Sequence, residues 1–129
     1  MSPAFPPVFV TAGGRCWRRR GITVCVKQHA FIRDFEMVAF KRRPRQPATR
    51  FRLFSALIVR APGIVGWREL IEHVYGDRPD GGADRPVKVF QFYSCNERAA
   101  FARLGIGFAT ERGIGMQAHD LWAEARPAA

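Results

Sequence analysis

The sequence predicts an α+β fold, in which a short antiparallel sheet precedes helices and a final β-hairpin. Residues 22–27 alternate β-branched apolar residues with other residue types, which is the period-two pattern of a strand. Residues 49–75 instead repeat apolar residues at the three- and four-residue spacing of helices. Near the end, two short apolar arms flank a glycine turn, as in a hairpin. With 129 residues, 47% of them hydrophobic, the chain has the material for one core.

The N-terminal third carries the signals of short strands. Residues 8–11 stop at Gly13-Gly14, and residues 15–20 stop at Gly21. Residues 22–27 form the clearest strand. Residues 31–40 have apolar residues on both alternating sets, so we expect a strand buried on both faces, with a short helix as the alternative. Residues 41–47 are a charged, proline-broken connection that continues neither element.

Two helices, each with one apolar face, are expected next. The first begins at Thr49, a suitable N-cap, and ends before Pro62-Gly63. The second spans about Gly66 to Tyr75 and stops at Gly76. The residues expected to face the core are Phe51, Phe54, Leu57 and Ile58 in the first helix, and Trp67, Leu70, Ile71 and Val74 in the second.

A third helix and a hairpin complete the pattern. After a loop at residues 77–84, Pro86 suits the first turn of a helix that extends to Arg103. Two apolar faces compete on this helix: Phe92, Cys95, Ala99 and Ala102 on one, and Phe90, Phe101 and Leu104 on the other. Residues 107–110 and 114–117 are strand-like arms around Glu111-Arg112-Gly113. Residues 118–129 are expected to be a short helix or a frayed tail.

This order of elements indicates a winged helix-turn-helix, in which three helices are followed by a two-stranded ribbon with a basic tip. In such a fold one helix enters the major groove of duplex DNA, and the ribbon reaches the adjacent backbone or minor groove. We therefore divide the chain into a basic β-rich N-terminal subregion (residues 1–45), a winged-helix domain (residues 46–118) and a tail (residues 119–129).

Charge favours a polyanionic partner. The formal net charge is +10 and the sequence pI is about 11.0. Residues 1–48 hold ten basic residues against two acidic ones, whereas residues 49–129 hold eleven against nine. Clustered charge of one sign raises the local concentration of phosphate groups and the rate of encounter with them. The alternative is a solvated basic face with no fixed partner.

Several classes of function are not indicated. No apolar run approaches the roughly 20 residues of a membrane span, and the first residues show no secretory signal, so we expect no membrane partner and a cytoplasmic location. Cys16, Cys25 and His29 have a spacing that fits no common zinc module, which favours ordinary reduced thiols. The three histidines are scattered, and no spacing suggests a nucleophile and its base. We predict no metal, no cofactor and no enzymatic activity.

Three segments, in order, are similar to a known family. Residues 47–54, P-A-T-R-F-R-L-F, loosely resemble L-T-P-x-E-F-x-L-L, and residues 62–71, P-G-I-V-G-W-R-E-L-I, resemble P-G-x-V-x-S-R-x-x-L. Residues 108–116, F-A-T-E-R-G-I-G-M, resemble I-x-T-V-R-G-x-G-Y. These are motifs of the winged-helix effector domain of OmpR-type response regulators, in particular of stand-alone forms without a receiver domain. The resemblance implies a DNA-binding transcriptional regulator, and homodimers on tandem half-sites.

The third helix departs from this family. The family carries a run such as H-I-S-R-L-R-R-K-L, whereas residues 91–99 here read Q-F-Y-S-C-N-E-R-A, with far fewer basic residues. In that alignment Phe92, Cys95 and Ala99 take the buried positions, and Phe90 and Phe101 lie on the outer side. The low positive charge could also mean that this helix binds protein.

The family resemblance and the hydrogen-bonding groups of the base edges together predict which residues contact DNA. On the third helix these are Gln91, Ser94, Asn96 and Arg98, because Asn or Gln can pair with adenine and Arg with guanine. Arg112 at the ribbon tip suits a narrow minor groove. Each of them has a solvated surface side chain as its alternative reading. The residues expected to contact phosphates without reading sequence are Arg18, Arg19, Arg20, Lys41, Arg42, Arg43 and Arg45.

Two other partners are compatible with the sequence. A protein-interaction module on the same scaffold, binding RNA polymerase or another acidic partner, would be favoured if Phe90, Tyr93 and Phe101 were exposed. Single-stranded nucleic acid could bind the N-terminal sheet if Trp17 and Phe31 stacked on bases.

Overall fold

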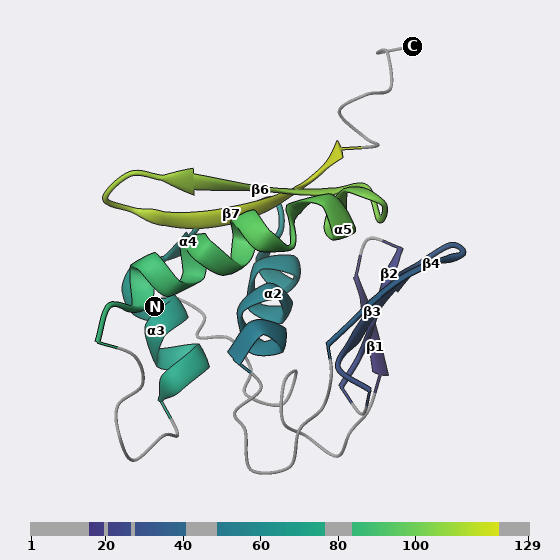
Figure 1. Ribbon diagram of the computed structural model, residues 1–129, viewed down its shortest axis with the longest axis horizontal. Coiled ribbons are helices and arrows are strands. Elements are labelled where there is room, and N and C mark those ends of the chain that lie inside the picture. Colours follow the sequence, from purple (N-terminus) through teal and green to yellow (C-terminus); the bar gives the residue numbers. More distant parts are fainter. Residues whose placement is uncertain (1–15, 20, 27, 41–48, 77–83, 122–129) are drawn as a thin grey trace.

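The protein is an α+β molecule whose helices lie between two antiparallel sheets (Figure 1). The computed structural model describes residues 16–19, 21–26, 28–40, 49–76 and 84–121. The first sheet has four strands in chain order within residues 16–39, and the second has three strands, of which the last in the chain order lies in the middle. Helix α2 (Thr49–Arg60) stands between the four-stranded sheet and helix α3 (Trp67–Tyr75) in Figure 1, and the hairpin of β6 and β7 (residues 106–120) runs along one side of the helices.

The first sheet is a meander of four short strands. They are β1 (Cys16–Arg19), β2 (Ile22–Cys25), β3 (Ala30–Arg33) and β4 (Glu36–Ala39). The strands predicted at residues 15–20 and 22–27 correspond to β1 and β2. The single strand predicted at residues 31–40 is wrong, because the chain turns back within it and pairs Phe31 with Val38. Asp34 takes φ +54°, a left-handed conformation that Asp tolerates better than most residues.

Helices α2 (Thr49–Arg60) and α3 (Trp67–Tyr75) follow the predicted periodicity. All four residues expected to face the core in α2 are buried. In α3, Leu70 and Val74 are fully buried, whereas Trp67 and Ile71 are half-buried and pack against the edge of the core. The hydrophobic pattern therefore predicted the inner faces of both helices correctly.

The third helical segment is interrupted at one residue. Helix α4 (Pro86–Asn96) and the short helix α5 (Arg98–Ala102) are separated by Glu97, whose φ and ψ of −97° and 4° lie outside the helical region. The continuous helix predicted to Arg103 is wrong in this respect. Chain direction changes at Glu97, so that α5 packs beside strand β6.

Aromatic rings join the first sheet to the helices and to the hairpin. The ring of Phe101 lies 4.6 Å from that of Phe54 in α2, 5.2 Å from that of Phe31 in β3 and 5.0 Å from that of Phe108 in β6, measured between centroids. Phe31, Phe54 and Phe101 are fully buried. One continuous core therefore connects elements from both ends of the described chain.

The second sheet is built on a long hairpin. Strands β6 (Ile106–Glu111) and β7 (Gly115–Asp120) pair along their full length, and the short strand β5 (Val65–Gly66) pairs with β7. Gly113 in the turn has φ +76°. Residues 118–120, predicted to be helical or frayed, belong to β7 because they pair with β6 opposite Ile106–Phe108.

An ion pair connects the two sheets. Both guanidinium nitrogens Nη1 and Nη2 of Arg33, at the end of β3, donate to the carboxylate of Asp120, at the end of β7, over 3.1 Å each. The Arg33 and Asp120 side chains are 14% and 23% exposed. Such bidentate pairs are geometrically specific, and this one ties the end of the hairpin to the N-terminal sheet.

Some predicted features lie outside the described residues. These are the strand at residues 8–11, the connection at residues 41–47, most of the loop at residues 77–84, residues 122–129 of the tail, and the basic residues Arg20, Lys41, Arg42, Arg43 and Arg45. Among the helices of the described part, none has the length and apolar character needed to cross a membrane.

Candidate nucleic-acid interface

The rotation of α4 is set by Phe90. This residue is fully buried, and its ring stacks on that of Tyr75 from α3, with 5.7 Å between centroids and 13° between planes. Pro86 occupies the first turn of the helix, where its missing N–H costs no helical hydrogen bond. Phe90 therefore defines the inner side of α4.

The side of α4 that the family resemblance placed inward in fact faces outward. Phe92 is 58% exposed, Cys95 and Ala99 are also exposed, and Phe90 and Phe101 are fully buried. That register was wrong because it copied the family's apolar positions, whereas the aromatic core here accepts Phe90 and Phe101. Residues two apart in sequence are separated by about 200° around the helix axis. Burial of Phe90 therefore turns Phe92 to the opposite side.

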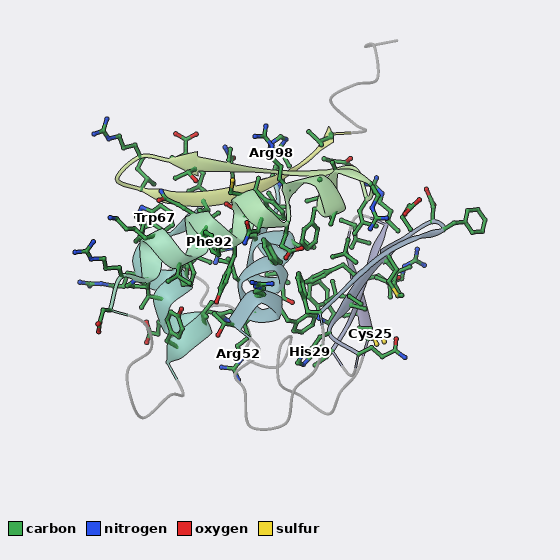
Figure 2. All side chains as sticks on the ribbon, viewed as in Figure 1. Cys25, His29, Arg52, Trp67, Phe92 and Arg98 are labelled. Carbon is green, nitrogen blue, oxygen red and sulfur yellow. The ribbon has the colours of Figure 1, made fainter. Side chains whose placement is uncertain are left out.

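The exposed face of α4 combines polar, basic and aromatic side chains. Phe92 lies near its middle, and Figure 2 labels this residue on the outside of the helix. The other exposed residues of the helix are Lys88, Gln91, Cys95 and Asn96, and Arg85 is exposed just before the first turn. Gln91 and Asn96 are thus accessible, as a groove contact requires.

Lys88 and Arg85 were not among the predicted contact residues. Both positive charges lie at the start of α4, which partly offsets the shortage of basic residues further along the helix. The correct rotation of the helix would have indicated that Lys88 faces outward. With Phe90 inward, Lys88 falls four residues before Phe92 and on the same side.

Ser94 differs from the other predicted contacts on α4. It is half-buried, and its Oγ donates a hydrogen bond over 2.9 Å to the carbonyl of Gln91. It lies four residues after Phe90 and so toward the inner side of the helix. The Ser94 proton is therefore already used within the helix, although its oxygen can still accept.

The acidic residue at the end of α4 is neutralised by a neighbour. Glu97 Oε1 accepts from Arg50 Nη1 over 3.3 Å, and the Glu97 side chain is 19% exposed. The Arg50 guanidinium also lies over the Tyr93 ring, 4.7 Å from its centroid, in the geometry of a cation–π contact. Arg50 thereby masks a carboxylate that would repel phosphates and covers one face of an aromatic ring.

The hairpin turn forms the wing tip, residues 112–114. Arg112 and Ile114 are exposed, and a Cβ added to Gly113 would meet nothing within 4 Å. The Trp67 N–H donates to the carbonyl of Ile114 over 3.1 Å, which attaches the tip to the start of α3. In Figure 1 the tip lies on the left, at the end of the molecule where α3 and the first turn of α4 are drawn.

The other residues predicted to contact nucleic acid do not lie beside the exposed face of α4 and the wing tip. Arg98 is exposed, but it belongs to α5, beyond the break at Glu97 (Figure 2). Arg18 is exposed on β1, at the opposite end of the molecule in Figure 1, and Arg19 follows it in the same strand. Phe31 is fully buried in the aromatic core, so the proposal that it stacks on single-stranded bases is wrong.

Two of the cysteines pair across the first sheet. Cys16 and Cys25 face each other across β1 and β2, with Cys25 buried and Cys16 exposed. A hydrogen bond between the two side chains raises the pKa of the Cys16 thiol, because it favours the protonated form. Within the described residues, no group of three or more His, Cys, Asp or Glu side chains is arranged to hold a metal ion.

Comparison with known proteins identifies the fold. No protein-family model and no curated protein matches the sequence. Among solved structures, the chain is similar to the DNA-binding domain of the response regulator AdeR, crystallised in complex with an intercistronic region. The TM-score is 0.54 and the sequence identity is 16%, over 78% of this chain and 95% of that one. The chain shares the fold of that domain. The resemblance to OmpR-type effector domains is thus confirmed at the level of the fold.

Proposed function

We propose that this protein is a sequence-specific transcriptional regulator that binds double-stranded DNA. In this proposal α4 enters the major groove, and the wing tip contacts the neighbouring backbone or minor groove. The observation that carries it is the exposed face of α4, with its amide and basic side chains, on the fold of a domain that was crystallised with an intercistronic DNA region.

The side chains divide into base-reading and phosphate-contacting groups. Gln91 and Asn96 have the donor and acceptor pair that matches adenine in the major groove. Ser94 would accept from a base or a phosphate group, and Arg98 would contact the strand at the far end of the helix. Arg112 would enter the minor groove or contact its phosphates. Lys88 and Arg85 would neutralise phosphates at the start of α4, which adds a salt-dependent contribution to affinity.

The basic N-terminal subregion would extend the contact with the backbone. Arg18 and Arg19 lie on β1, away from α4, so they would engage phosphates only if the duplex bent or a second copy of the protein bound beside the first. We attribute the same role to Arg20, Lys41, Arg42, Arg43 and Arg45. Homodimers on tandem half-sites would bring two such subregions onto one site.

The alternative, a protein-interaction module that binds RNA polymerase or another acidic partner, loses its main support. It was expected to use exposed Phe90, Tyr93 and Phe101, but Phe90 and Phe101 are fully buried. Tyr93 is half-buried, with Arg50 over its ring. Phe92 is the aromatic residue of α4 that would remain for such a partner.

Selection of duplexes from a random pool, followed by gel-shift titration of the selected sequence, tests the proposal. Asn96→Ala should reduce affinity for the selected duplex by about tenfold and broaden base preference at one position, since a bidentate contact contributes about 1–3 kcal/mol to discrimination. Arg103→Ala is the matched control, because Arg103 is exposed and its long 3.7 Å ion pair with Glu36 lies away from α4. Recovery of no preferred sequence, with equal affinity for all duplexes, would refute sequence-specific binding.

A further inference from the structure

The exposed aromatic ring of Phe92 has no structural explanation in the core. Five large hydrophobic side chains are exposed among the described residues, namely Phe35, Met37, Ile64, Phe92 and Ile114. Of these, Phe92 is the one on α4. A phenylalanine that is 58% exposed gains little from burial within the fold, and its recorded ring contact is a tilted one with the neighbouring Tyr93, 6.2 Å between centroids. Most of the Phe92 ring is therefore free to contact a ligand.

The neighbours of Phe92 favour one kind of base pair. Asn96 follows it by four residues, so the two side chains are adjacent on one helical face, with about 5–6 Å between their Cβ atoms. Gln91 is also exposed beside them. Amide side chains match the N6 and N7 edge of adenine, and an apolar side chain matches the 5-methyl group of thymine. The middle of this face thus carries both complements of an A·T base pair.

Guanine readers are sparse on the same face. Arg and Lys are the side chains that match the O6 and N7 edge of guanine. On the exposed face of α4, Lys88 is the basic residue, and it lies one turn before Phe92, at the start of the helix. Beyond the end of α4, Arg50 is engaged by Glu97 and Tyr93, and the exposed Arg98 belongs to α5, so neither lies beside Phe92 at the middle of the helix. Chemical complementarity therefore assigns the centre of the helix to A·T pairs.

We infer that Phe92 is a specificity-determining residue, which reads thymine through its 5-methyl group while Gln91 or Asn96 pairs with adenine. This inference rests on the proposed function and names the chemistry of the site that α4 recognises. Enclosing one methyl group between a phenyl ring and the groove is worth about a fourfold difference in affinity.

Replacement of thymine by uracil removes that methyl group and changes nothing on the hydrogen-bonding edge. We would titrate the wild-type protein with the selected duplex and with duplexes in which single thymines become deoxyuracil. The expected result is about a fourfold loss at one or two positions. Phe92→Ala should bind the thymine duplex about as weakly as the wild type binds the uracil duplex, and should no longer distinguish the two.

Two further variants isolate the apolar contact. Phe92→Leu keeps an apolar side chain and should retain part of the methyl sensitivity. Asn96→Ala should weaken binding but leave the ratio between thymine and uracil duplexes unchanged. Because Phe92 is exposed, we expect the variants at this position to fold, which circular dichroism and urea unfolding would verify.

The outcomes separate this inference from the proposed function. Tight, selective binding that ignores every thymine-to-uracil change overturns the inference and leaves the proposed function standing. Methyl sensitivity that persists in Phe92→Ala assigns the contact to another residue and also overturns it. Failure to bind any duplex overturns the proposed function itself, and binding of Phe92 to a protein partner would then be the remaining reading of its exposure.

Discussion

The two hairpin tips of this protein each contain one residue with a positive φ, in a two-residue turn at the first tip and a three-residue turn at the second, and they differ in charge. The β3–β4 turn places Asp34 at φ +54°, and the β6–β7 turn places Gly113 at φ +76°. Each tip exposes an apolar side chain: Phe35 is fully exposed and Ile114 is 59% exposed. The first tip carries Asp34 and Glu36, the latter 3.7 Å from Arg103 Nη1, whereas the second carries Arg112. The tips point to opposite ends of the molecule in Figure 1.

This difference separates hairpin shape from hairpin function. Both tips protrude, so protrusion alone does not distinguish a phosphate-binding ribbon from a structural turn. The sign of the charge at the tip and the attachment of the tip to the helices distinguish the two. The wing tip bears a cation and is bonded to the start of α3 through Ile114, while the acidic tip would repel a nucleic acid. The core and the Arg33–Asp120 pair hold the two ends together.

The largest expected effect comes from removing the ring that both ends share. Phe101→Ala should lower the free energy of unfolding by about 3–5 kcal/mol, because Phe101 contacts rings from β3, α2 and β6. If one core joins both hairpins, urea unfolding followed by hydrogen exchange will show the two sheets losing protection together. Loss of protection in one sheet alone would mean that the two ends fold as separate units.

Two glycines of the wing should respond differently to alanine. A Cβ at Gly115 would collide with the backbone of Val65 and lie 2.9 Å from the Gly66 Cα, so Gly115→Ala should cost about 1–3 kcal/mol and loosen β5 from β7. Gly113→Ala meets open space and should cost about 1 kcal/mol, from the positive φ alone. Urea denaturation of both variants measures the difference. Equal costs would contradict the close approach at Gly115.

Substitution at each tip tests the contrast in charge. Arg112→Ala should weaken binding to the selected duplex by about tenfold and reduce the slope of affinity against salt concentration by about one. Phe35→Ser, at the acidic tip, should change neither quantity. Fluorescence anisotropy at two salt concentrations provides both values. An effect of Phe35→Ser equal to that of Arg112→Ala would place the acidic tip against DNA and abolish the distinction.

The ion pair between the sheets should have the smallest effect. A double-mutant cycle with Arg33→Ala and Asp120→Ala should give a coupling energy of about 1 kcal/mol, because the pair is bidentate but still partly solvated. Thermal or urea unfolding of the three variants measures it. A coupling energy of zero would show that the aromatic core alone joins the two ends.

The spacing of apolar residues correctly predicted the elements whose burial pattern depends on nearby residues in the sequence. The inner faces of α2 and α3 followed from apolar spacing, and the wing turn was predicted around Gly113 but one residue too early, at 111–113 in place of 112–114. The β3–β4 turn was missed because Asp34-Phe35 is not a recognised turn pair, and the adjacent apolar residues continue the strand pattern on both sides. Only the pairing of Phe31 with Val38 reveals it.

The candidate site was harder to predict because its geometry depends on tertiary contacts. The third helical segment has two apolar faces, and either could have faced the core. The face with Phe90 and Phe101 is buried because these rings contact Tyr75 and Phe54, which lie far away in sequence. That choice exposed Phe92 and Lys88. The neutralisation of Glu97 by Arg50 likewise joins residues from different helices, and no local pattern indicates it.

The wing tip is held by main-chain atoms, since the bond from Trp67 ends on the Ile114 carbonyl and the β5–β7 ladder is a backbone pairing. These bonds use no side-chain atom of Arg112 or Ile114. A library randomised at these two codons would sample new surface chemistry on an unchanged scaffold, and the wing becomes the natural place from which to retarget this protein.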